Sequence, residues 1–167
     1  MSGSETGDHT AVGPTPRTDE QLSRLFAELQ GRRTAEEGEG DDRRPEALLE
    51  TVLELVGADE SFAFDERLVT QSLDELLLML ISMRTGDTNG NALMRDFTEL
   101  FDSQLSPGTV YPALHALEDE GTLEMFELVR SKEYRIADRE RAATRAEAAA
   151  RQHLVLGAFL YAAATDL

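Results

Sequence analysis

Hydrophobic residues recur at helical spacing in two short stretches before residue 60 and in several longer ones after it. An amphipathic helix is predicted from about 19 to 30, and another from Pro45 to about Val56, where Gly57 suits the helix end. Their apolar stripes are Leu22, Leu25, Phe26 and Leu29 in the first, and Leu48, Leu49, Val52 and Val56 in the second. Residues 31–44 are charged and interrupted by glycine, which is typical of a linker, and residues 1–18 are predicted to be disordered.

The main domain is expected to begin near Ser61. The segment Leu73–Met83 is so continuously apolar that its helix must be buried on most sides, and Ser72 and Glu75 have the spacing of a capping box. A turn of Gly, Asp, Thr and Asn leads into a second helix, from about 91 to 102. Its predicted core residues are Leu93, Met94, Phe97, Leu100 and Phe101.

A third helix follows a break at 103–107 and ends at Gly121. Because proline is tolerated best in the first turn, Pro112 places the start of this helix near Gly108 or Thr109. The residues Val110, Ala113, Leu114 and Leu117 fall on one side of the helix and must face the core, whereas Gly108, Pro112, His115 and Asp119 fall opposite, flanked by Thr109 and Tyr111. The free N–H groups at such a helix start favour a phosphate.

After Gly121 the period changes from helical to alternating. Residues 123–128 and 134–136 flank a polar turn, which predicts a β-hairpin. Asp138 is expected to cap a final helix that runs nearly to the C-terminus. The order of three helices, hairpin and long helix predicts a mainly α fold with a small β-hairpin wing: a winged helix-turn-helix (61–137) with a long C-terminal dimerisation helix (138–167), preceded by accessory helices and an acidic linker (19–60).

In such a fold the third helix enters the major groove of DNA and the wing meets the backbone or the minor groove. The predicted DNA-binding residues are Ser106, Gly108, Thr109, Tyr111, Pro112 and His115 on the helix, and Arg130, Lys132 and Arg135 on the wing. On pattern alone, a small α+β domain with ordinary surface residues explains the same segment. His115 is equally well explained as a solvated side chain.

The sequence around the third helix closely resembles the PadR family of winged-helix transcriptional regulators. The resemblance is carried by the run from Leu105 to Leu114 (LSPGTVYPAL), by Leu117–Gly121 (LEDEG) and by Glu133–Ile136 (EYRI), and it extends over about residues 70–165. It implies a homodimer on palindromic operator DNA, usually acting as a repressor. In this family the helix led by Ser, Gly, Thr and Tyr enters the major groove.

This chain departs from the family pattern in three places. The turn before the second helix usually reads His-Gly-Tyr, whereas here it is Asn89-Gly90-Asn91; Ala137 stands where a Thr usually ends the wing; and residues 1–60 have no counterpart in the minimal family form. The loss of the tyrosine could alter packing or an effector site. The identity of a small-molecule effector stays open.

The net charge of −17 is unusual for a protein that binds DNA. Lys132 is the single lysine among sixteen basic residues, and this acidic, lysine-poor composition resembles that of proteins from salt-accumulating organisms. It also resembles that of the family's haloarchaeal members, one of which responds to reactive oxygen species. The charge is uneven: from 129 to 151, seven bases stand against four acids.

The last helix carries a heptad-like seam that predicts dimerisation. Its members are Ala142, Ala146, Ala149, His153, Leu156, Leu160 and Ala163, and a second stripe of Ala150, Leu154, Ala158 and Tyr161 is expected to contact the rest of the fold. The alternative is that the helix packs within its own chain, against the helix at 45–56. Dimerisation is favoured by the resemblance and by the preference of oligomers for two-fold symmetry. The helix would then pair with its symmetry mate or with the partner's N-terminal helices, which would fix the separation of the two recognition helices.

The sequence argues against an enzyme. His9, His115 and His153 form no cluster, and no nucleophile–base pair, phosphate-binding glycine loop or metal-ligand spacing is found, so no cofactor is expected. The lack of cysteine excludes disulfides and thiolate zinc sites. No apolar run reaches the ~20 residues of a membrane helix and no secretory signal is seen, which predicts a cytoplasmic protein without membrane contact. The rival function is a winged helix that binds protein partners and not DNA.

Overall fold

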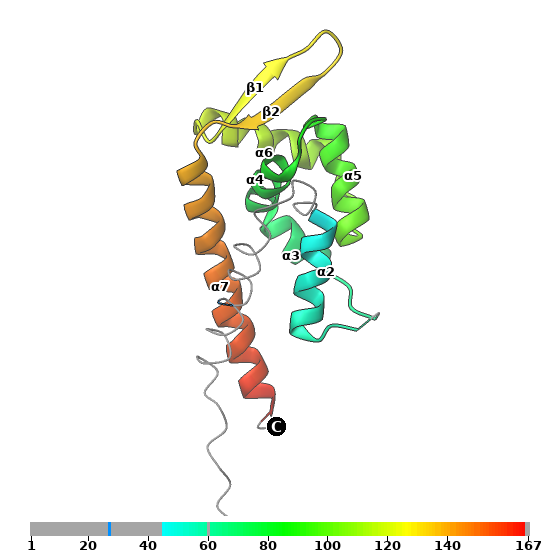
Figure 1. The fold of residues 1–167 in the computed structure, drawn as a ribbon, viewed down its shortest axis with the longest axis vertical. Coiled ribbons are helices and arrows are strands. Elements are labelled where there is room, and N and C mark those ends of the chain that lie inside the picture. Colours follow the sequence, from blue (N-terminus) through cyan, green and yellow to red (C-terminus); the bar gives the residue numbers. More distant parts are fainter. Residues whose placement is uncertain (1–26, 28–44, 60, 166–167) are drawn as a thin grey trace, which may run out of the picture.

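The computed structural model describes Ala27 and residues 45–59 and 61–165 (Figure 1). Its elements are α2 (Pro45–Val56), α3 (Glu66–Gln71), α4 (Leu73–Met83), α5 (Gly90–Phe101), α6 (Pro107–Asp119), β1 (Leu123–Glu127), β2 (Lys132–Ile136) and α7 (Arg139–Thr165). The tail and linker predicted before Pro45 lie outside the described residues, as does the 19–30 helix except for Ala27, which is helical.

The core lies around α4, which contacts α5, α6, α7 and β2. Its largest fully buried hydrophobic and aromatic side chains are Leu77, Leu78, Leu93, Phe97, Val110, Leu114, Leu117 and Tyr134. The adjacent residues Leu77 and Leu78 point in different directions from the helix, so their joint burial confirms that α4 is covered on more than one side.

The predicted fold class is confirmed. α5 and α6 are joined by a short connection at 102–106, and the antiparallel hairpin β1–β2 follows them with Met125 opposite Tyr134. Gly121 has a φ of 72°, a conformation that suits glycine and lets the chain leave α6 for β1. The side chain of Asp138 caps α7 as expected, accepting from the Arg141 amide at 2.9 Å. The six-residue helix α3 was not predicted.

Two local predictions were wrong. Ser72 precedes α4, but it makes no side-chain cap; its hydroxyl lies 2.9 Å from Nε2 of His153 on α7, while Glu75 pairs with Arg145. The start of α6 is earlier than Pro112 suggested, because Pro107 is already helical and Pro112 lies inside the helix. Pro112 has no N–H to donate to the carbonyl four residues earlier in the helix. Because Pro112 is exposed, water can bond to that carbonyl instead.

Tyr134 offers a test of the core. Its hydroxyl is buried and has no hydrogen-bond partner in the described part of the chain. Burial, Glu118 and Tyr111 raise the pKa of this phenol. A buried polar group without a partner costs about 1–3 kcal/mol, so Tyr134→Phe is expected to raise the free energy of unfolding by about 1 kcal/mol. Urea titration measures this change, and a loss of stability would show that the hydroxyl is satisfied.

Candidate DNA-binding surface

The start of α6 presents small and hydroxyl side chains. Ser106 is the N-cap residue, yet its hydroxyl lies 3.0 Å from that of Thr109 rather than on a backbone amide. The amides of Thr109 and Val110 both donate to the Ser106 carbonyl, at 2.9 and 3.1 Å. The Gly108 amide makes no hydrogen bond within the described part of the chain, and Gly108 is exposed. An anion approaching this helix end would therefore meet an unused donor.

The outer face of α6 carries the exposed residues Pro112, His115 and Asp119, as the periodicity predicted. The imidazole Nδ1 of His115 lies 3.5 Å from a carboxylate oxygen of Glu118. The inner face is buried through Val110, Leu114 and Leu117. The helix therefore offers one uninterrupted side to a partner while the other anchors it in the domain.

Thr109 and Tyr111 are half-buried rather than fully exposed. The Tyr111 ring packs over Gly90 at the start of α5, so close that a Cβ on Gly90 would lie 2.7 Å from two ring carbons. Tyr111 is thus part of the contact between α5 and α6 as well as a surface residue. This contact could not be predicted from the sequence, since the two residues lie on different helices.

The wing projects beyond the helices (Figure 1). Its three predicted residues, Arg130, Lys132 and Arg135, are all exposed. Arg130 and Lys132 make no ion pair within the described residues, whereas the Arg135 guanidinium lies 4.5 Å from the ring centroid of Phe126 on the neighbouring strand. A cation–π contact of this kind holds the Arg135 side chain along the hairpin.

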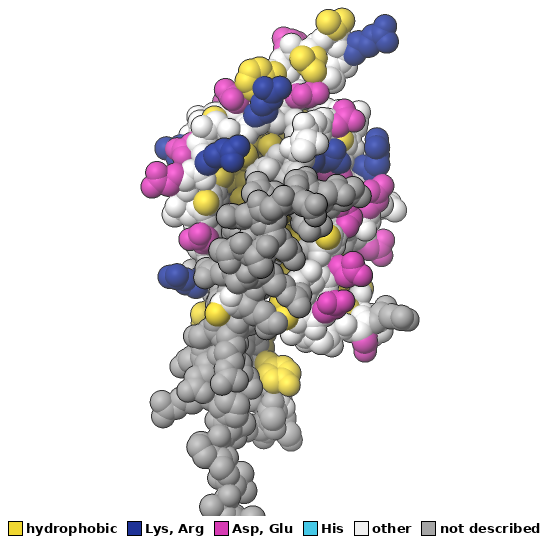
Figure 2. All heavy atoms as spheres, viewed as in Figure 1, with side chains coloured by type: hydrophobic (Ala, Val, Ile, Leu, Met, Phe, Trp, Pro, Cys, Tyr) yellow, Lys and Arg dark blue, Asp and Glu magenta, His cyan; other side chains and the backbone are white. Residues whose placement is uncertain are grey.

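The wing tip also carries apolar side chains that sequence reasoning missed. Val129 is fully exposed, Leu128 is about half exposed at 48%, and Phe126 lies on the outer face. Figure 2 shows hydrophobic and basic side chains together over the projecting hairpin. The signal was present in the sequence for Leu128 and Val129, because they lie between the two strands, where a polar turn is expected.

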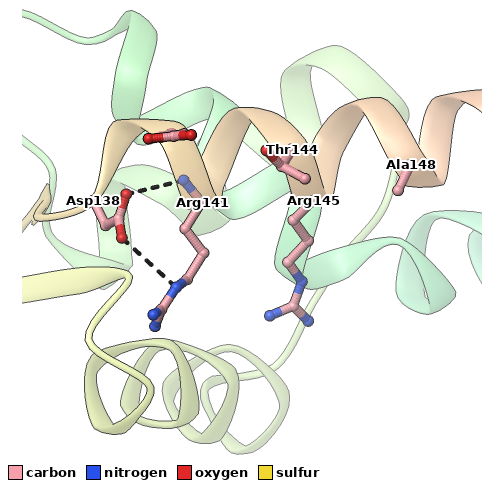
Figure 3. Close-up of a pocket in the computed structure, with 6 residues that line it drawn as sticks. Asp138, Arg141, Thr144, Arg145 and Ala148 are labelled. Carbon is pink, nitrogen blue, oxygen red and sulfur yellow. Dashed lines mark hydrogen bonds and ion pairs between the residues drawn. The ribbon is translucent and has the colours of Figure 1, made fainter.

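Arg141 and Arg145 of α7 are bound within their own chain and do not belong to this surface. Arg145 pairs with Asp74 at 2.5 Å, Glu75 at 2.8 Å and Glu120 at 3.0 Å, and the hydrogen bond that it donates to Glu75 raises the pKa of its guanidinium. Arg141 donates to the carbonyl of Glu120. Figure 3 shows both side chains leaving successive turns of α7 on the same side, beside a shallow depression. Their charges tie α7 to α4 and α6.

A second ion pair fixes the loop before α5. Arg84 donates through Nε to Asp96 at 2.7 Å and through a terminal nitrogen to the Asp87 carbonyl at 3.1 Å. The carboxylate is buried, and its hydrogen bond raises the pKa of the Arg84 guanidinium. The loop that leads into the helix-turn-helix is therefore bound to α5 itself.

The predicted seam of α7 divides into two parts. Ala142 is buried in the core of its own chain, Ala146 and Ala149 are half-buried, and His153 contacts Ser72. α7 packs chiefly along α4. The alternative to dimerisation expected it to pack along the helix at 45–56, which is α2. The other predicted seam residues with described side chains, Leu156, Leu160 and Ala163, are exposed. Of the second stripe, Leu154 and Ala158 are half-buried and Ala150 is exposed.

Among the described residues, no helix combines the length and the apolar character that crossing a membrane requires. Residues 77–146, from the middle of α4 into α7, match the sequence model of the Transcriptional regulator PadR-like family. This segment includes α6 and the wing. The matched family is one of transcriptional regulators and not of enzymes, which supports the prediction that the chain is not an enzyme.

Curated relatives from halophilic archaea are also similar. The chain is 42% identical over 108 residues to "Transcriptional activator GvpE1" of Halobacterium salinarum, across 65% of this chain and 56% of that protein. It is 49% identical over 84 residues to "Transcriptional activator GvpE" of Haloferax mediterranei, across 49% of this chain and 43% of the relative. The chain thus spans about half the length of the curated relatives it matches. No solved structure matches it significantly.

Proposed function

We propose that this chain is a PadR-like transcriptional regulator that binds specific DNA sequences as a homodimer and activates transcription. One observation carries the proposal. The start of α6 has an unused amide and exposed small residues, and the wing of the same domain has basic side chains at its tip without a carboxylate partner among the described residues. A helix start of this kind suits the major groove, and a basic wing tip suits the phosphates beside it.

The direction of regulation follows the relatives rather than the family at large. The family resemblance implied repression, but the similar proteins are named as activators. We therefore replace the expectation of a repressor with that of an activator. Their names say nothing of oxidative stress, so a role in a stress response stays a prediction; mapping of bound genomic sites with and without peroxide tests it.

The α6 residues and the wing residues have different tasks in this proposal. Gly108 lets the helix backbone approach the duplex, and Thr109 and His115 reach base edges. Arg130 and Lys132 contact phosphates, which adds affinity without sequence preference. Ser106 holds the Thr109 hydroxyl, while Pro112 keeps this face free of bulk. Arg135 packs on Phe126 within the wing and makes only a peripheral contact with the DNA backbone.

Thr109→Ala and Lys132→Ala are expected to separate the two tasks. The first should cost about 1–3 kcal/mol on the preferred operator and little on scrambled DNA. The second should weaken both duplexes by a similar factor, because phosphates are the same in each. Fluorescence anisotropy titration of the two duplexes measures this. Arg139→Ala, at an exposed α7 base outside the surface, is the control. If neither variant alters DNA binding, the docking is wrong and the protein-partner function gains support.

The salt dependence of binding is a further expectation. In molar salt the screening length falls to about 3 Å, so an acidic protein can approach DNA without long-range repulsion. Arg130 and Lys132 from two protomers give about four phosphate contacts, which predicts a slope of about −4 for log affinity against log salt concentration. We propose that bound cations bridge Glu118 or Asp119 to phosphates, which would flatten the slope further. A slope as steep as about −8 would contradict this model of binding.

The homodimer is proposed to form through the distal half of α7. The side of α7 that carries Ala149, which is half-buried, and His153, which contacts Ser72, continues one and two turns after His153 at Leu156 and Leu160. Val155 and Phe159 lie beside them, so the exposed apolar residues form one arc of the helix. A second copy of the same helix matches such an arc through two-fold symmetry.

A further inference from the structure

Gly90, the first residue of α5, lies directly under the ring of Tyr111 from α6. A Cβ at this position would lie 2.7 Å from Cε1 and Cζ of the ring and 2.8 Å from its hydroxyl oxygen. Non-bonded carbons are most stable at about 3.5–4.0 Å, so a methyl group and the ring cannot occupy these places together. The backbone of Gly90 is not in the left-handed region. The close approach of the ring is therefore what requires glycine here.

The segment in front of Gly90 is held by two neighbouring elements. The Arg84 guanidinium donates to the Asp87 carbonyl at 3.1 Å, and the Tyr134 amide of β2 donates to the Thr88 carbonyl at 3.2 Å. The Asn89 side chain caps α5. Moving this segment away from the ring would break such bonds. A side chain at position 90 would therefore displace the ring of Tyr111, whose backbone lies in the second turn of α6.

We propose that Gly90 is a positioning residue of the DNA-binding surface: its bare Cα seats the Tyr111 ring and so fixes the start of α6 relative to α5 and the wing. This inference rests on the proposed function, because the place of α6 matters for DNA only if α6 reads DNA. It assigns Tyr111 a role between helices in addition to any contact of its hydroxyl with the duplex.

A double-mutant cycle tests the proposal. Gly90→Ala is expected to lower operator affinity at least about tenfold and to reduce the preference over scrambled DNA, because a shifted α6 no longer fits the groove. In a Tyr111→Ala background the same change is expected to alter affinity less than about twofold, since the ring is gone. It should then also raise the melting temperature slightly, because alanine favours a helix more than glycine does.

Gly86→Ala is the matched control. Gly86 lies in the same loop, outside the left-handed region, and a Cβ there meets nothing within 4 Å. This variant is expected to bind and melt like the unchanged protein. A Gly90→Ala variant that also binds like the unchanged protein would overturn the proposal.

The remaining outcomes are also decisive. An equal loss of affinity from Gly90→Ala in both backgrounds would overturn the positioning role, because the effect would not depend on the ring. If Gly90→Ala alone fails to fold by circular dichroism, the double variant is compared with Tyr111→Ala: equal binding supports the role and weaker binding refutes it. If the protein without substitutions shows no operator preference, the proposed function itself is refuted. If it shows the preference but the effects of Gly90→Ala and Tyr111→Ala simply add, only this inference is refuted.

Discussion

Replacing Leu156 and Leu160 by glutamate is expected to make the protein monomeric and to lower its affinity for a two-half-site operator by at least about 100-fold. Both side chains are 57% exposed and belong to the apolar arc on distal α7. Four glutamates from two copies would meet in the proposed interface, unpaired and partly desolvated. A monomer also loses the gain from binding two half-sites together, which is about 10²–10⁴-fold in linked systems.

Light scattering reports the mass of this double variant, and anisotropy titration reports its affinity. Ala150→Glu is the control, because it adds a charge at an exposed α7 position outside the arc. The control is expected to remain a dimer with unchanged affinity. A double variant that still has the mass of two chains, or an unchanged protein with the mass of one, would show that α7 is not the interface.

Phe97→Ala is expected to lower the free energy of unfolding by about 3–5 kcal/mol, the range seen when a buried phenylalanine is truncated. The Phe97 side chain is fully buried in α5 and packs on Phe101 with ring centroids 5.7 Å apart. A domain of this size has a free energy of unfolding of only about 5–15 kcal/mol, so the substitution would remove a large share of it.

Phe62→Ala serves as the matched control for this core test. Phe62 is 48% exposed and contacts Phe64 edge to face at the rim of the same aromatic group. We expect it to cost less than about 1 kcal/mol, because a large part of the ring is already in water. Urea unfolding of both variants measures the difference. Equal costs would mean that the core is not centred on Phe97.

The helices of the core could be predicted because their periodicity is strong. α4, α5 and α6 each bury one or more apolar stripes, and the switch from period 3.6 to period 2 after Gly121 marks the wing. α3 escaped prediction because six residues make less than two turns, too few to establish a period. The exposed and buried sides of α6 were also predicted correctly. Its start was not, because Pro112 was expected in the first turn and lies further inside the helix.

Contacts between segments that are far apart in the chain could not be predicted from the sequence. Glu75 has the spacing of a capping box with Ser72, yet it pairs with Arg145, seventy residues away. The contact between Tyr111 and Gly90 depends on how two helices cross. The heptad-like seam of α7 places small and apolar residues on one side of the helix, but spacing alone does not say what covers them. α4 of the same chain contacts α7 near the buried Ala142 and the ion-paired Arg145, whereas Leu156 and Leu160 are exposed.

The central claim is that α6 and the wing read a specific DNA sequence. The most direct test selects duplexes from a random pool with the full chain in molar salt, and then titrates the best duplex and a scrambled version of it. We expect a palindromic sequence to be bound at least about 1,000-fold more tightly than the scrambled duplex, with two chains per duplex. Equal affinity for both duplexes, or no binding to either, would contradict it.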